Sequence, residues 1–91
     1  MKYYYLDCAN LREKKETHEY LAAVFSFPLY YGKNLDALYD CLTELGNCEI
    51  TLENTDLLDT DYAQRVHDVF LDAEHNNPHL VLHEEPGTIG V

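Results

Sequence analysis

Residues 29–45 read LYYGKNLDALYDCLTEL, and this stretch predicts a loop that leads into a short helix. Asn34 is a favourable N-cap because its side-chain oxygen can accept hydrogen bonds from the free N–H groups of the first turn. Gly46 suits the position just past the end, so we predict a helix over residues 35–45. At about 100° per residue, one side of this helix carries five apolar side chains and is interpreted as its core face: Leu35, Leu38, Cys41, Leu42 and Leu45.

The opposite face of this predicted helix combines carboxylates with an aromatic ring: Asp36, Tyr39, Asp40 and Thr43. The helix dipole favours Asp36 in the first turn, but Asp40 lies mid-helix without that benefit. Like charges four residues apart destabilise an isolated helix by about 0.2–0.5 kcal/mol. With Tyr30 and Tyr31 just before it, this face is both aromatic and anionic. It is interpreted as a solvated face or a partner-binding face, with catalysis less favoured than either.

The length and charge of the chain limit its fold and its partners. Ninety-one residues, 46% of them hydrophobic, are enough for one domain with a modest core, so we predict a single domain over residues 1–91. Seventeen acidic residues against six basic ones give a net charge of −11. This charge would repel a phosphate backbone and attract a basic protein. We therefore expect a basic protein partner and no direct nucleic-acid binding.

Hydropathy and cysteine usage indicate the compartment. The chain has no apolar run near the ~20 residues that a membrane span needs and no secretory signal pattern, so we expect a cytoplasmic protein without membrane contact. Its three cysteines, Cys8, Cys41 and Cys48, form no CxxC or CxxH pair. We therefore expect reduced, half-buried thiols, a monomer, and neither a structural zinc site nor a bound cofactor.

The N-terminal third predicts a strand followed by a helix. Residues 2–6, KYYYL, are β-formers and predict the first strand. A helical pattern opens at Lys14 or Lys15 and is closed by Pro28. Its predicted apolar face is Tyr20, Leu21, Val24 and Phe25. His18 falls on the polar side, and we interpret it as a surface histidine because no second metal ligand follows at helical spacing.

The second half of the chain predicts two more strands around a longer helix. Residues 48–53, CEITLE, predict a strand with one wet face, and 56–58 predict a single helical turn. A helix is expected over 62–75, then a strand over 80–83 and a mobile tail over 84–91. The buried face of that helix is expected to be Tyr62, Val66, Val69, Phe70 and Ala73. Crossovers of this length join parallel strands, so we predict an α/β fold with a small three-stranded parallel sheet and helices packed beside it.

Residues 28–43, PLYYGKNLDALYDCLT, closely resemble the central segment of the barstar family, intracellular inhibitors of secreted barnase-type ribonucleases. Residues 69–73 and 80–82 show weaker similarity to later segments of that family. The resemblance implies a sheet in the order 1-2-3 with the helices layered against it. It also implies an inhibitor without enzymatic activity whose partner is a basic, barnase-like ribonuclease.

The resemblance assigns roles to individual residues. In barstar the helix and its preceding loop plug the nuclease active site, and carboxylates occupy the places of RNA phosphates. This implies the phosphate-mimicking role for Asp40, a position beside it for Asp36, and an outlying acidic contact for Asp72. The other implied partner-binding residues are Tyr30, Gly32, Asn34, Leu35, Tyr39 and Thr43. Carboxylates suit such a site because they form charge-assisted hydrogen bonds with its Arg, Lys and His side chains.

Some positions depart from the family pattern. Tyr39 stands where barstar has tryptophan, Lys33 where it has glutamate, and Asp72 where it has the longer glutamate; the connection over residues 54–68 is also shorter. Changes of this kind alter partner choice more readily than fold. Two alternatives stay open. One is an acidic module for a different basic protein, and the less favoured one is a metal-dependent hydrolase using Asp36, Asp40 and a histidine, although no catalytic motif accompanies them.

Overall fold

Three parallel strands form the sheet of this computed structural model, which describes residues 1–87. The strands are β1 (Lys2–Asp7), β2 (Cys48–Glu53) and β3 (Leu80–Glu85), hydrogen-bonded in the order β1-β2-β3. Leu52 of the central strand pairs with Leu6 on one side and Glu84 on the other. The predicted parallel sheet and its 1-2-3 order are therefore confirmed.

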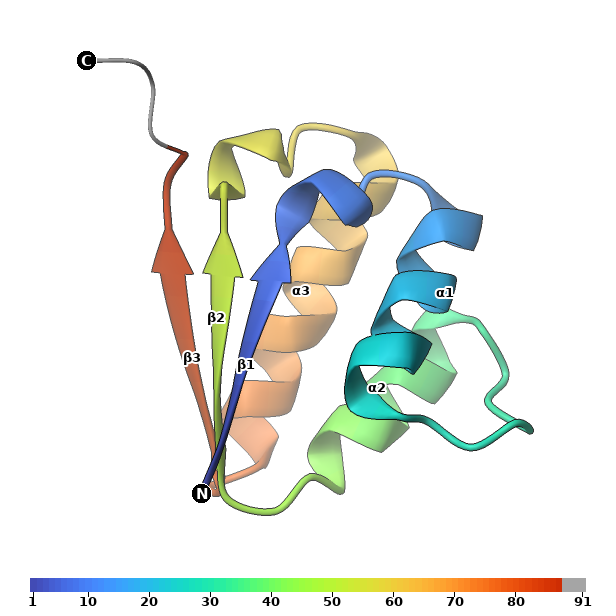
Figure 1. Cartoon of the computed structure of the whole chain (residues 1–91), viewed down its shortest axis with the longest axis vertical. Coiled ribbons are helices and arrows are strands. Elements are labelled where there is room, and N and C mark those ends of the chain that lie inside the picture. The colour runs from blue at the N-terminus through green and yellow to red at the C-terminus, as the bar shows by residue number, and fades with distance from the viewer. Residues whose placement is uncertain (88–91) are drawn as a thin grey trace.

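Three α-helices accompany the sheet: α1 (Lys14–Phe25), α2 (Leu35–Thr43) and α3 (Asp61–Asn76). Two short 3₁₀ turns, η1 (Cys8–Asn10) and η2 (Thr55–Leu57), follow the first two strands. Figure 1 shows α3 running along the sheet, with α1 and α2 beyond the β1 edge. Within residues 1–87, no helix is long and apolar enough to span a membrane.

The core lies between the sheet and the helices, as the apolar patterns predict. On the other face of the sheet, Tyr3, Tyr5 and Val81 are exposed. Thr51 pairs with Tyr5 and His83 in the register and is buried, so β2 exposes fewer side chains on this face than its sequence predicts. The buried apolar cluster is Leu6, Cys8, Leu11, Leu21, Tyr31, Leu38, Leu42, Cys48, Ile50, Leu52, Val66, Phe70, Ala73 and Leu80.

The end of α2 differs from the prediction. The helix stops at Thr43 instead of Leu45, and no glycine described has a positive φ, so Gly46 does not act as a left-handed cap. A distant side chain takes that role. The Nδ2 of Asn77, which follows α3, donates to the carbonyl oxygens of Leu42 and Leu45, both at 3.0 Å. Because this cap comes from another segment, the local sequence does not reveal it.

The predicted tail over 84–91 is wrong for its first residues. Glu84 and Glu85 continue β3, and Glu84 Oε1 lies 2.9 Å from Nε2 of His67 on α3. The Gly87 N–H donates to Oδ1 of Asp56 at 2.7 Å, which ties this segment to η2. These tertiary contacts fix residues that the composition alone predicts to be mobile. Residues 88–91 lie outside the described part of the chain.

The surface prediction for His18 is also wrong. Its side chain is buried, with 1% exposed, and α1 presents Thr17, His18 and Leu21 to the core. Two tyrosine hydroxyls make this possible, since Nδ1 lies 2.6 Å from Oη of Tyr31 and Nε2 lies 2.6 Å from Oη of Tyr62. A polar ring can enter a core when both of its nitrogens find partners.

The three cysteines are unpaired, and two of them are more buried than expected. Cys8 and Cys48 are buried, whereas Cys41 is half-buried. Burial, followed by the negative charge of Asp7, raises the pKa of the Cys8 thiol to about 12. That thiol is therefore protonated at neutral pH and behaves as a small apolar core residue.

Candidate protein-binding site

The loop between α1 and α2 presents its side chains outward. It begins where Ser26 adopts a left-handed conformation, φ 55°, and caps α1. In Figure 1 this segment projects from the molecule on the side away from β3. Leu29 and Tyr30 follow with exposed fractions of 106% and 88%, the highest among the large apolar side chains described. Such exposure leaves both side chains free for contact with another molecule.

Tyr31 faces the opposite way and anchors the same loop. Only 7% of it is exposed, and its ring packs against Phe27 with centroids 4.7 Å apart. Its backbone N–H donates to the carbonyl oxygen of Pro28 at 2.9 Å, which closes a turn. The two adjacent tyrosines, which look equivalent in the sequence, therefore divide into an exposed Tyr30 and a buried anchor.

The entry to α2 is fixed by Asn34, as predicted. Its Oδ1 accepts from the Ala37 N–H at 2.8 Å and its Nδ2 donates to the Gly32 carbonyl at 3.3 Å. A Cβ on Gly32 would lie only 3.3 Å from Cβ of Ala37, so the missing side chain permits a close approach. Lys33 between them has φ 52°, a left-handed conformation uncommon for a residue with a side chain.

Three of the residues predicted for the site lie around one hollow. Tyr30, Gly32 and Asp40 help to line a cavity of about 450 Å³. The other residues that line it are Pro28, Ala37, Cys41 and Glu44. Leu29 and Glu44 were not among the candidates predicted from the sequence. Glu44 could have been found, because it follows Asp40 by one further helical turn.

Three carboxylates lie at four-residue intervals along this face: two on α2 and one at the C-cap that follows it. Asp36, Asp40 and Glu44 are all exposed. Within residues 1–87, none of them forms a salt bridge. Their mutual repulsion on an isolated helix is about 0.2–0.5 kcal/mol for each i, i+4 pair. The fold thus keeps a row of like charges that gains no compensation inside the described chain.

Asn76 connects the acidic helix to Asp72 on α3. Its Nδ2 donates to Oη of Tyr39 at 2.9 Å and to the backbone carbonyl of Asp72 at 3.0 Å. Tyr39 is thereby held against α3, while the Asp72 side chain stays exposed. This linking role of Asn76 could not be predicted, because the sequence around it indicates only the end of a helix.

The remaining predicted residues contact their own segment. The Thr43 hydroxyl donates to the carbonyl oxygen of Asp40 at 2.9 Å, Asn34 caps the helix, and Leu35 is half-buried against the core. No three metal-binding side chains converge within residues 1–87. The structure therefore does not bring a histidine to Asp36 and Asp40 in the described chain, as the hydrolase alternative would need.

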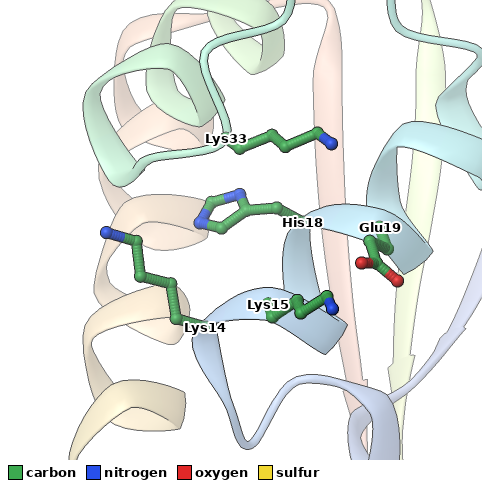
Figure 2. Close-up of a pocket in the computed structure, with 5 residues that line it drawn as sticks. All are labelled: Lys14, Lys15, His18, Glu19 and Lys33. Atoms are coloured by element: carbon green, nitrogen blue, oxygen red, sulfur yellow. The ribbon is translucent and has the colours of Figure 1, made fainter.

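A second hollow of about 400 Å³ lies on the α1 side of the same loop and has the opposite charge. Figure 2 shows the side chain of Lys33 passing over the His18 ring, with Lys14 on one side and Lys15 and Glu19 on the other. The three lysines form no salt bridge within the described residues. The loop thus separates an anionic surface on α2 from a cationic hollow on α1.

These features define a class: a small α/β protein with a three-stranded parallel sheet and an acidic, aromatic surface on one helix and the loop before it. The chain belongs to the barstar family, since the family model described as barstar, barnase inhibitor, matches residues 1–84. A curated protein of Bacillus subtilis (strain 168), named "Putative ribonuclease inhibitor YrdF", is 40% identical over 62 residues. That match covers 63% of this chain and 68% of the relative.

Proposed function

We propose that this protein is a ribonuclease inhibitor and that its target is a basic, barnase-type ribonuclease. Family membership and the name of the Bacillus subtilis relative support the inhibitor role. The observation that carries the proposal is the row of Asp36, Asp40 and Glu44, which form no salt bridge within residues 1–87 and lie beside the exposed Tyr30. A row of like charges without internal partners is suited to an external cationic surface.

The mechanism is occlusion of the nuclease active site. A ribonuclease holds phosphate with Arg, Lys and His side chains, and carboxylates form short, charge-assisted hydrogen bonds with the same donors. We assign the central phosphate-mimicking position to Asp40, because it lines the hollow together with Tyr30 and Gly32. Asp36 and Glu44 lie one turn before and after it. Inhibition by this route needs no cofactor and no chemistry on the inhibitor.

The flanking residues supply shape and apolar contact. Leu29 and Tyr30 extend from the loop as apolar anchors, and buried aromatic anchors at interface centres carry much of the affinity in protein complexes. Tyr39 and Asp72 form the far rim, held together through Asn76. Asn34, Leu35 and Thr43 mainly shape the surface through internal contacts, so we expect smaller effects from them.

The second candidate is binding to a different basic protein through the same face. The Lys33 side chain favours this alternative, because it places a positive charge beside the acidic surface where the family has a glutamate. Such a change can redirect a family fold to a new client. The two candidates predict the same essential residues on α2 and differ only in whether a ribonuclease is inhibited.

An inhibition titration tests the proposal. Increasing amounts of the chain are added to a barnase-type ribonuclease, and cleavage of a short RNA is followed. We expect stoichiometric inhibition by the wild type. Asp40→Ala should lose several kcal/mol of binding free energy, because cations of the nuclease are left buried without a partner. Asp72→Ala should lose less, because its carboxylate lies at the rim.

The control is Glu85→Gln, which removes one exposed negative charge at the end of β3, away from α2. It should inhibit like the wild type. Failure of the wild type to inhibit any barnase-type enzyme would favour a different basic client. Full inhibition by Asp40→Ala would place the interface elsewhere on the molecule.

A further inference from the structure

The buried His18 lies at the centre of a chain of hydrogen bonds that the proposed function does not use. Both of its ring nitrogens are 2.6 Å from tyrosine hydroxyls, Tyr31 in the loop and Tyr62 on α3. The ring centroids are 5.7 Å and 6.0 Å apart, so the three rings also pack against one another. These hydrogen bonds therefore join three segments that are separate in the sequence: α1, the loop and α3.

The loop has few other polar connections to the fold. Within residues 1–87, the hydrogen bonds of 28–34 stay inside the loop or reach the first turn of α2, apart from the bond between Tyr31 and His18. Tyr31 stands directly between Tyr30 and Gly32, two of the proposed contacts. Whatever fixes Tyr31 consequently fixes the direction in which its neighbours face a partner.

Burial determines the protonation states of the three side chains in this hydrogen-bond network. Burial raises the pKa values of Tyr31 and Tyr62, so both hydroxyls remain protonated at neutral pH. Burial, followed by the positive charge of Lys14, lowers the pKa of His18 and favours its neutral ring. A neutral imidazole carries one N–H and one acceptor nitrogen. One tyrosine therefore donates to the ring and the other accepts from it.

A charged His18 would disturb this arrangement. An imidazolium has two N–H donors and no acceptor, so the tyrosine that donates to the neutral ring would lose its acceptor. The charged groups around the ring add to the cost: Lys14, Lys15 and Glu19 from α1 and Lys33 from the loop line the hollow over it, three cations against one carboxylate (Figure 2). On the α3 side the ring faces the neutral Tyr62 hydroxyl.

We propose that His18 is a positioning residue for the partner-binding loop: its neutral ring, tied to Tyr62 of α3, holds Tyr31 and thereby the exposed Tyr30 and Gly32. This rests on the proposed function for its consequence in binding, but the ordering of the loop is a property of the free protein. A fully satisfied buried polar network specifies one packing arrangement, which an apolar contact at this position would not do.

Amide hydrogen exchange on the free protein tests the positioning without any partner. Tyr31→Phe removes a single oxygen, and His18→Gln removes the ring tie. Both should raise the exchange rate of the amide at position 31, whose N–H donates to the Pro28 carbonyl, about tenfold, as the loss of one hydrogen bond predicts, while amides of β2 stay protected. Unchanged loop exchange in a folded Tyr31→Phe protein would overturn the proposal and leave His18 as a packing residue only.

A pH profile of binding provides the second readout. The wild type should lose affinity for a barnase-type ribonuclease as the pH falls below 6.5, the ordinary pKa of histidine, towards the lowered pKa of His18, and His18→Gln should show a much weaker dependence. His83→Gln is the control, because His83 pairs with Glu49 on the exposed side of the sheet, and it should keep the wild-type profile. A His18→Gln profile identical to that of the wild type would contradict the proposal. If no ribonuclease binds at all, the proposed function fails while the exchange experiment still decides the role of His18.

Discussion

The side-chain amide of Asn77 forms more hydrogen bonds than any other side-chain amide described in the molecule. It is 3% exposed, donates to two carbonyl oxygens at the end of α2, and accepts from the His79 N–H at 3.0 Å. From the sequence, Asn76-Asn77-Pro78 predicts only the end of a helix. The second role of Asn77, as a cap for a helix more than thirty residues earlier, depends on tertiary packing and has no local signature.

Asn77→Ala should lower the free energy of unfolding by about 1–3 kcal/mol, because carbonyl groups at the end of α2 then lose a buried donor. Chemical denaturation at neutral pH measures this loss. Gln64→Ala is the control, since Gln64 is an exposed amide on α3, and it should change the stability by less than about 0.5 kcal/mol. Equal effects of the two substitutions would mean that the long-range cap is not stabilising.

His18 should make stability depend on pH in a defined direction. Its pKa in the folded protein lies below the ordinary value of 6.5, so the unfolded chain binds a proton first as the pH falls. The free energy of unfolding should therefore decrease as the pH falls from about 6.5 to the lowered pKa of His18. Above pH 6.5 this group should cause no change of stability with pH. Denaturation curves of the wild type and His18→Gln at several pH values check this. A slope in this window that is equal in both proteins would show that other groups cause it.

The segment made of the loop and α2 shows how far local sequence predicts a site. The N-cap at Asn34 and the separation of core and acidic faces follow from side-chain chemistry and helical periodicity, and the structure confirms both. The hydrogen bond between Tyr31 and His18 and the burial of His18 on α1 could not be predicted. They depend on tertiary contacts, because the hydroxyls of one loop tyrosine and one α3 tyrosine both hydrogen-bond the histidine ring. These hydrogen bonds offset the free-energy cost of burying the ring.

The same helix should become more stable when its central charge is removed. Asp40→Ala eliminates repulsion from Asp36 and Glu44 and introduces a better helix former, which together should stabilise the fold by up to about 1 kcal/mol. Asp61→Ala provides a contrast, because Asp61 lies in the first turn of α3, where the helix dipole favours a negative charge. Thermal melts should show opposite shifts, and a destabilised Asp40→Ala would indicate an internal role for that carboxylate.

At the scale of the whole molecule, composition and structure give different information. The net charge of −11 predicts attraction of a basic partner, and that inference needs no coordinates. The sequence does not show that Lys14, Lys15 and Lys33 gather around one hollow beside the acidic surface, because they come from α1 and from the loop that follows it. A uniform anionic field is therefore interrupted next to the residues proposed to contact the partner.

Charge reversal at two lysines separates the local field from the total charge. Lys33→Glu and Lys2→Glu change the net charge equally, but Lys2 is exposed on β1, away from the loop. At low salt, Lys33→Glu should raise the association rate with a basic ribonuclease by more than Lys2→Glu, because it removes repulsion beside the proposed contact surface. The difference should disappear near 1 M salt, where the screening length is about 3 Å. Stopped-flow measurements over a salt series give both rates, with dissociation expected to change less. Weaker binding of Lys33→Glu would mean that the partner presents an acidic group to the cationic hollow, so that Lys33 favours the complex instead of opposing it.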